Sequence, residues 1–197
     1  MIELKNNFKH LEPAPYNKLA WIVSGVTQSD GSFGISFKMT NSKFGYKISP
    51  FYRIELTLAS INLINTIHKF FNNQGANGRT GIRMLRGTCY YEITDLYSLW
   101  HVVVPHFLKY PLYGYKQIVF YKFVQILALL YPYFNKKYKP DLIIGKILYL
   151  TLNLNLSIKK NGNRSSLLHL RSEKIYNKIN LTPLEVEKKL LNSSVRI

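Results

Sequence analysis

The chain has 197 residues, 47% hydrophobic and 14% aromatic, so it is long and apolar enough to bury a core and is not a disordered polypeptide. It carries 27 Lys and Arg against 10 Asp and Glu, a formal net charge of +17. That charge favours a polyanionic partner, because bound phosphates release condensed counterions. The single cysteine, Cys89, excludes an internal disulfide and a cysteine-based zinc site.

A basic surface of this kind can bind nucleic acid, bind an anionic membrane or simply be solvated. The N-terminal segment MIELKNNFKHLEPAPYNK lacks the apolar run of a signal peptide and the pattern of a transit peptide. The most apolar stretch, Ile118–Phe134, is interrupted by Lys122 and Gln125 and ended by Pro132. It is too short to span a bilayer, so we expect a buried helix and no membrane partner.

The first half of the chain alternates between helical and strand periodicity. Asn17 is a candidate N-cap for a helix that runs to about Ser29, and Asp30 with Gly31 ends it. From Ser32 the period changes to two, with apolar residues on one face: Phe33, Ile35, Phe37 and Met39. A second alternating run has inward and outward residues: Ile54, Leu56 and Leu58 inside; Arg53, Glu55 and Thr57 outside.

A second helix and a hairpin follow. Ser60 or Asn62 is expected to cap a helix whose stripe ends at Phe71. Two strands, Arg79–Leu85 and Thr88–Thr94, are predicted after a glycine-rich turn. Their inward positions are Ile82, Met84, Tyr91 and Ile93, and their outward positions are Arg79, Arg83, Tyr90 and Glu92. Further helices are predicted over Leu96–Val103, Lys116–Tyr131 and Asp141–Leu150.

This order predicts an α+β fold of the type αββαββα, a four-stranded antiparallel sheet with helices on one face. The other face is expected to be basic and to contact nucleic acid through Lys38, Arg53, Arg79, Arg83 and Tyr90. Solvent exposure alone is the alternative explanation of its polarity. We expect one domain over residues 1–157.

Residues 158–197 are expected to form a basic tail, with a short helix from Pro183 to Leu191. Lys159, Lys160 and Arg164 lie among Asn, Gly and Ser, so a second, electrostatic contact with nucleic acid is predicted there.

The segment Trp21–Phe33 reads WIVSGVTQSDGSF and carries the candidate chemistry. Gly25 and Ser29 are four residues apart on one helical face, where small residues let a second helix approach closely. Asp30 falls at the C-terminal end of the helix, which the helix dipole makes unfavourable for an anion. An ordinary helix-to-strand turn is the structural alternative.

The segment resembles the LAGLIDADG motif of homing endonucleases. The stretch VVPHFLKYPLYGYKQIVFYKFVQILALL and the tract KILYLTLNLNLS are similar to the regions that follow in that family. The resemblance covers about Tyr16–Ser157 and is to the N-terminal half of two-domain members. It implies that two motif helices pack side by side and that Asp30 is a catalytic residue and a ligand of Mg²⁺, which activates water for phosphodiester cleavage. Gly25 and Ser29 would then lie in the helix pair.

The chain contains one such motif, so a homodimer or a partner chain would have to supply the second carboxylate. Gln28 stands where the family is often acidic. Three functions stay open: a homodimeric site-specific endonuclease of double-stranded DNA, a non-catalytic RNA-binding derivative (an intron maturase or a component of an organellar ribosome), and one half of a split enzyme. Abundant residues with AT-rich codons indicate a mitochondrial or other organelle gene. His101 and His106 lack metal-ligand partners and are interpreted as packing residues.

Overall fold

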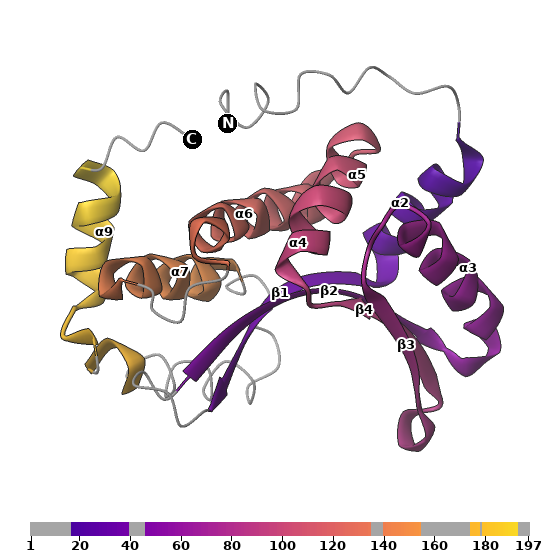
Figure 1. Ribbon diagram of the computed structural model, residues 1–197, viewed down its shortest axis with the longest axis horizontal. Coiled ribbons are helices and arrows are strands. Elements are labelled where there is room, and N and C mark those ends of the chain that lie inside the picture. Colours follow the sequence, from indigo (N-terminus) through magenta and orange to yellow (C-terminus); the bar gives the residue numbers. More distant parts are fainter. Residues whose placement is uncertain (1–16, 40–45, 135–139, 155–173, 178, 193–197) are drawn as a thin grey trace.

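The described part of the chain folds as an antiparallel sheet with helices on one side (Figure 1). The computed structural model describes residues 17–39, 46–134, 140–154, 174–177 and 179–192. The elements are α2 Lys18–Asp30, β1 Gly31–Met39, β2 Tyr46–Thr57, η1 Leu58–Ser60, α3 Ile61–Asn72, β3 Gly78–Arg83, η2 Met84–Arg86, β4 Thr88–Ile93, α4 Leu96–Ser98, η3 Leu99–Val103, α5 Val104–Lys109, α6 Gly114–Leu130, η4 Tyr131–Tyr133, α7 Asp141–Leu154 and α9 Pro183–Asn192. The predicted α+β class and the αββαββα order are confirmed.

The four strands pair antiparallel in the order β1-β2-β4-β3. Ser32 pairs with Arg53, Arg53 with Glu92, and Glu92 with Arg79, so these four residues form one row across the sheet. The helices cover one face, and the sheet arches beneath them so that the other face, here called the open face, is concave (Figure 1). The alternation predicted for the strands therefore separates a core face from an open face.

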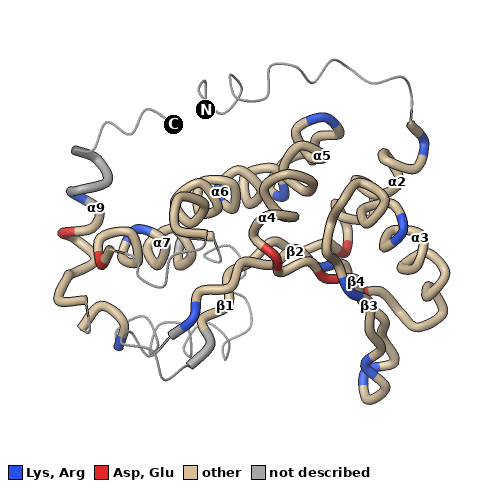
Figure 2. Tube along the Cα trace, in the orientation of Figure 1, with Lys and Arg blue, Asp and Glu red and all other residues tan. Residues whose placement is uncertain are grey.

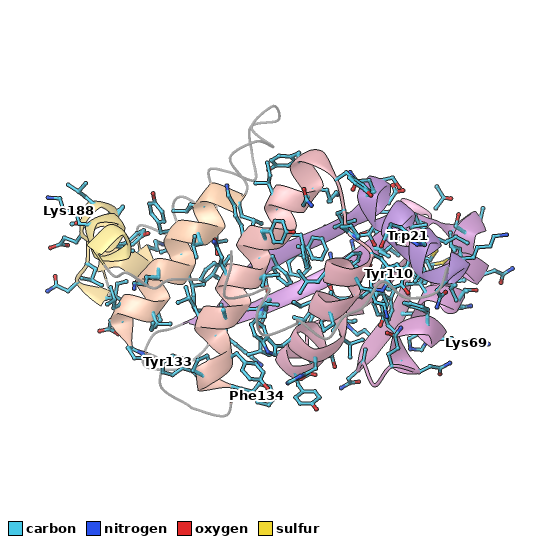
Figure 3. All side chains as sticks on the ribbon, turned by 90° about the horizontal axis from the view of Figure 1, so that it is seen from above. Trp21, Lys69, Tyr110, Tyr133, Phe134 and Lys188 are labelled. Atoms are coloured by element: carbon cyan, nitrogen blue, oxygen red, sulfur yellow. The ribbon has the colours of Figure 1, made fainter. Side chains whose placement is uncertain are left out.

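The core lies between the sheet and α5 and α6. Phe33 is 4% exposed, and its ring centroid lies 5.3 to 5.4 Å from those of Tyr52, Phe107, Phe120 and Phe123. Burial of one such side chain contributes about 1.5–3 kcal/mol to folding. Seen from the helix side, α6 and α7 run next to each other across the sheet (Figure 3).

The boundaries of α2 confirm the predicted cap. The side-chain oxygen of Asn17 accepts a hydrogen bond from the backbone N–H of Ala20 at 3.1 Å. The helix ends at Asp30, and Gly31 starts β1 directly. Ser60 occupies the N-cap position of α3 but makes no side-chain capping bond, since η1 runs straight into that helix.

The helix predicted over Leu96–Val103 is longer than expected and continues through Pro105 to Lys109. Proline inside a helix removes one N–H donor and crowds the preceding turn. Here the five residues before α5 form a π-helical turn, η3, which widens the helix ahead of Pro105. The proline is therefore accommodated within the helix.

Ile82 and Met84 of the hairpin were predicted to point into the core, but neither side chain is buried. Ile82 is on the core side of β3, as its pairing with Cys89 shows, but it is 51% exposed. Met84 lies in the turn η2 and is 78% exposed, while the neighbouring Leu85 is fully exposed. The β3–β4 hairpin projects beyond the helices (Figure 1), so its tip has no layer to pack against.

The helix predicted from Pro183 is confirmed, and it packs on α7. Val186 is buried, and a Cβ at Gly145 would lie 2.8 Å from a methyl of Val186. Across the described ranges, none of the helices combines the length and apolarity that a membrane crossing requires.

Candidate nucleic-acid interface and catalytic carboxylate

Asp30 stands exposed at the C-terminal end of α2. The hydroxyl of Ser29 donates a hydrogen bond to its Oδ2 at 2.6 Å. Lys116, from the start of α6, donates to the backbone oxygen of Gly31 at 2.6 Å. Burial lowers the pKa of Lys116 below its ordinary value, and the nearby Asp30 carboxylate opposes part of that effect. The Asp30 carboxylate and the Lys116 ammonium group therefore lie near each other where α2 ends and β1 begins.

This corner is held by buried hydrogen bonds along the inner face of α2. The Oγ1 of Thr27 lies 2.8 Å from the backbone oxygen of Val23 and 2.7 Å from the hydroxyl of Tyr52. The Ser24 hydroxyl donates to the backbone oxygen of Tyr110 at 2.8 Å. These contacts fix α2 against β2 and against the segment that leads into α6.

Gln28, which departs from the family pattern, has a structural part in the same corner. Its side-chain amide donates to the backbone oxygen of Tyr113 at 3.2 Å and accepts from the backbone N–H of Tyr113 at 3.1 Å. This two-way bond ties the last turn of α2 to the start of α6, which carries Lys116.

The outer face of α2 has no cover within the described residues. Gly25 and Ser29 are exposed, and a Cβ built on Gly25 meets no atom within 4 Å. Ile22 is 39% exposed. Trp21 is 37% exposed although the edge of its ring packs against Tyr110 at 5.3 Å (Figure 3). The predicted small-residue face thus exists as an apolar stripe with open space above it.

The open face of the sheet carries a network of arginine and glutamate. Arg53 and Arg79 both donate to Glu92, and Arg83 donates to both oxygens of Glu55 at 2.8 and 3.1 Å. Glu92 was expected to be exposed, but its side chain is 3% exposed because the two guanidinium groups cover it. Burial alone would raise the pKa of Glu92, but the hydrogen bonds from Arg79 and Arg53 outweigh it and hold the pKa below its ordinary value.

Two aromatic rings lie flat across the open face. A Cβ at Gly34 would lie 2.6 Å from the ring of Phe51, and one at Gly81 would lie 2.5 Å from the hydroxyl of Tyr90. The guanidinium of Arg53 stands over Phe51 at 5.1 Å and over Tyr90 at 5.8 Å. Because Gly34 and Gly81 have no side chain, the two rings can pack directly on the neighbouring strands, and the rings in turn contact the guanidinium of Arg53.

Lys and Arg recur along the β3–β4 hairpin, and a basic residue also lies at the start of β2 (Figure 2). Of the predicted contact residues, Arg53, Arg79, Arg83 and Tyr90 share the open face. Lys38 pairs with Lys47 at the far end of β1 and β2, so its backbone position continues the alternation of the open-face residues in these strands. Lys159, Lys160 and Arg164 lie outside the described residues.

Lys116 and the exposed Lys47 were not among the site residues predicted from the sequence. Lys116 contacts Gly31 across 85 residues of sequence, which no local pattern predicts. The position of this lysine shortly after the YPL segment was the one signal in the sequence that could have identified it. Lys47 continues the outward alternation of β2 and could have been predicted from a longer second strand.

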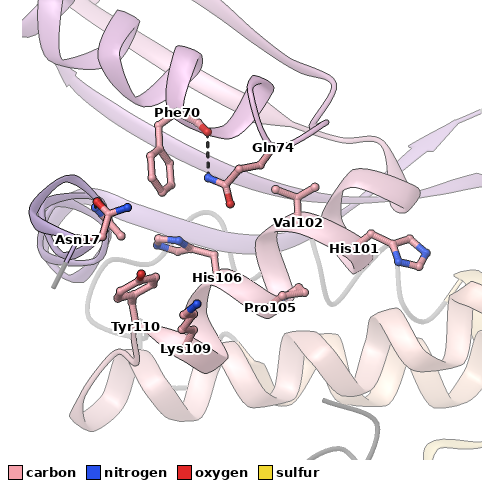
Figure 4. A pocket seen from close by; sticks show the side chains of 10 residues that line it. Asn17, Phe70, Gln74, His101, Val102, Pro105, His106, Lys109 and Tyr110 are labelled. Carbon is pink, nitrogen blue, oxygen red and sulfur yellow. Dashed lines mark hydrogen bonds between the residues drawn. The ribbon is translucent and has the colours of Figure 1, made fainter. Parts of the chain in front are cut away.

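The histidines behave as packing residues. His106 is 4% exposed, its Nε2 lies 3.3 Å from the Ser24 hydroxyl, and burial lowers its pKa to about 3. His101 is exposed and bonds the Tyr131 hydroxyl at 2.6 Å. Both line a hollow of about 320 Å³ at the start of α2, with Asn17, Gln74 and Lys109 among its walls (Figure 4).

This hollow lies away from Asp30, because Asn17 and Asp30 are at opposite ends of a helix about 20 Å long. No cluster of three His, Cys, Asp or Glu side chains that could hold a metal occurs among the described residues. Asp30 is a suitable oxygen ligand for Mg²⁺, which prefers several oxygen atoms in octahedral geometry. One described chain therefore offers one carboxylate of such a site and needs further oxygen ligands to complete it.

Known proteins share this sequence pattern. Probable intron-encoded endonuclease 2 of Neurospora crassa is 27% identical over 160 residues, which cover 80% of this chain and 34% of the relative. Probable intron-encoded endonuclease 3 of Neurospora crassa is 29% identical over 99 residues, covering 49% of this chain and 17% of the relative. The chain thus spans about a third or less of the curated relatives it matches.

Solved structures share the fold. The LAGLIDADG meganuclease I-CpaMI bound to uncleaved DNA has a TM-score of 0.61 at 22% identity, over 82% of this chain and 50% of that one. I-SmaMI, bound to an uncleaved DNA target in the presence of calcium ions, has a TM-score of 0.61 at 21% identity, over 80% and 49%. The homing endonuclease I-TnaI has a TM-score of 0.58 at 23% identity, over 84% of this chain and 99% of its own.

A family model described as LAGLIDADG endonuclease matches residues 23–127, which is more than half of the 197-residue chain. The match begins within α2 and runs through the sheet into α6, so it contains Asp30, the open face and Lys116. The chain belongs to the LAGLIDADG endonuclease family.

Proposed function

We propose that the chain is a site-specific endonuclease of double-stranded DNA that works as a homodimer. The observation that carries the proposal is the face of α2 that no described residue covers, where a Cβ on Gly25 has no neighbour within 4 Å and Asp30 stands exposed at the end of the stripe. Two copies packed through this face would bring two Asp30 carboxylates together. The second copy would thus supply the further carboxylate that the described part of one chain does not place there.

In this proposal, DNA binding and cleavage depend on different residues of the chain. The concave open face binds duplex DNA through its basic side chains. The two Asp30 carboxylates hold divalent metal, preferably Mg²⁺, which when bound supplies activated water and charge stabilisation at the phosphodiester. Lys116, anchored to the Gly31 carbonyl, places a positive charge beside the same phosphate and stabilises the negative charge that develops there.

A second candidate is an RNA-binding derivative without catalysis. It is favoured by the absence of a carboxylate cluster around Asp30 among the described residues and by the formal net charge of +17. In that case Asp30 has no partner carboxylate, and its replacement leaves nucleic-acid binding unchanged. A partner chain that supplies the second motif is the third possibility, and it predicts activity only in a mixture of two proteins.

The two matching relatives are probable intron-encoded endonucleases from Neurospora crassa. With the AT-rich codon bias of the composition, this supports the proposal that the gene lies in an intron of a mitochondrial or other organelle genome, and that the protein acts there.

The test measures oligomeric state and cleavage in parallel. The proposal expects a dimer by light scattering at micromolar concentration and Mg²⁺-dependent cleavage of a member of a randomised duplex DNA pool. Gly25→Leu should give a folded monomer without cleavage, because the added side chain fits one copy but blocks a second helix. The matched control Asn65→Leu adds the same side chain to the exposed side of α3 and should remain dimeric and active. A monomeric wild type that cleaves no member of the pool in Mg²⁺ or Mn²⁺ contradicts the enzyme.

A further inference from the structure

The three arginines on the open face are held in different ways. Arg53 uses Nε, at 2.7 Å, and Nη2 on the Oε2 of Glu92, and its guanidinium also covers two aromatic rings. Arg83 donates hydrogen bonds to both carboxylate oxygens of Glu55, and its guanidinium lies over the ring of Tyr90, 4.9 Å from the ring centroid. Their side chains are 28% and 29% exposed. Both guanidinium groups are already occupied by partners within the protein.

Arg79 differs from both. It makes one hydrogen bond, from Nη2 to the Oε1 of Glu92 at 2.6 Å, and its side chain is 67% exposed. Glu92 is its only acceptor among the described residues, and no cation–aromatic contact is present for it there. Nη2 carries two N–H groups, so an N–H from each terminal nitrogen remains available to one ligand.

Glu92 holds Arg79 in place from below. The carboxylate is 3% exposed in the central strand β4, and its other oxygen is bound by Arg53 in the same cross-strand row. The two arginines keep it ionised, and it cannot turn without losing one of them. The long Arg79 side chain is therefore ordered before any ligand binds, which reduces the entropy lost on binding.

The Arg79–Glu92 pair suits a base edge better than a phosphate. A phosphate bound to Arg79 would lie close to the Glu92 carboxylate and be repelled by it. The major-groove edge of guanine is uncharged and presents two acceptors, O6 and N7, that match a guanidinium fork. A duplex seated on the concave open face brings its groove to this row of residues.

We infer that Arg79 reads one guanine of the target in the major groove, with Glu92 as its positioning residue. Arg53 and Arg83 hold the surface in shape and do not read bases. The inference rests on the proposed function, since it requires that duplex DNA binds the open face.

The experiment selects bound members of a duplex DNA pool with a randomised central segment, using the full chain. Wild type should enrich guanine at one position of each half-site. Arg79→Ala should reduce that preference roughly 5- to 150-fold while leaving the other positions unchanged. Arg79→Lys keeps the charge but lacks the planar fork, and it should weaken the preference less than Arg79→Ala does.

Two further variants separate reading from charge. Glu92→Gln should weaken the guanine preference while total affinity for the pool stays equal or rises, because a negative charge has been removed. Arg86→Ala, at the exposed hairpin turn, should lower affinity for all sequences alike and reduce the slope of log affinity against log salt by about 0.9 per lost phosphate contact.

Retention of the guanine preference by Arg79→Ala, or a uniform loss of affinity, overturns the inference and leaves the proposed function standing. Absence of duplex binding by the wild type overturns both. Because Arg79 is mostly exposed, Arg79→Lys should fold normally, and its melting curve checks this.

Discussion

A Cβ on Gly31 would lie 2.7 Å from the backbone oxygen of Thr27, closer than such atoms can approach. The backbone of Gly31 has φ −77°, which any residue adopts, so the close approach and not the conformation requires glycine. β1 begins here directly beneath the last turn of α2, and this places Asp30 at the corner.

Gly31 and Gly25 should therefore respond in opposite ways to the same substitution. Gly31→Ala should lower the free energy of unfolding by about 1–3 kcal/mol, because the new methyl meets fixed backbone. Gly25→Ala should raise it by up to about 1 kcal/mol in a monomer, since alanine favours the helix and the site is open. Urea denaturation of both variants measures the difference, and equal effects would contradict the geometry.

Asp30→Asn should abolish Mg²⁺-dependent cleavage while DNA affinity stays equal or increases. The amide cannot hold the metal as a carboxylate does, and one repulsion with the phosphates is removed. Cleavage assays and fluorescence anisotropy on the same duplex measure the two effects. Full activity of the variant would refute the role of Asp30.

Lys116→Met should lower the cleavage rate about 10²–10³-fold with little change in DNA affinity. The substitution removes the ammonium that donates to the Gly31 oxygen beside Asp30. The matched control is Lys109→Met, at the hollow near the opposite end of α2, which should cleave at the wild-type rate. If both variants lose activity equally, the effect is one of overall charge.

Buried His106 should make the fold sensitive to mild acid. Its pKa is about 3 in the folded chain and about 6.5 in an unfolded one, so below about pH 6.5 the unfolded state binds the extra proton. Stability is complete above about pH 6.5 and falls with decreasing pH by up to about 1.4 kcal/mol per unit.

His106→Gln should flatten this slope between about pH 6.5 and 5.5, above the range in which most carboxylates titrate. Denaturant unfolding at several pH values measures it, with His101→Gln as the control that removes an exposed imidazole. An unchanged slope in His106→Gln would show that the imidazole is protonated in the folded state.

The strands and their faces could be predicted because alternation with period two is a local property of the sequence. It placed Arg53, Arg79 and Arg83 on one side correctly. The exposure of Ile82 could not be predicted in the same way, because it depends on where the helix layer ends above the sheet.

The site was predictable only as far as it is local. Asp30, Gly25 and Ser29 lie within one motif, whereas Lys116 reaches Gly31 across 85 residues. Glu92 was expected on the open face, but its burial depends on two arginines from different strands, one of them 39 residues away. Such contacts follow from strand order and register, which alternation alone does not determine.

The division of α2 into faces has a consequence for how such a protein can change its target. The inner face holds the core through Ser24 and Thr27, the outer face is open around Gly25, and the end carries Asp30, so few of its positions are free to vary. Arg79, the residue inferred to read a base, and its positioning residue Glu92 lie on β3 and β4, outside this helix. In the proposed endonuclease, substitutions that change the target would therefore accumulate on the sheet without disturbing the carboxylate at the end of α2, so its specificity would evolve more readily than its chemistry.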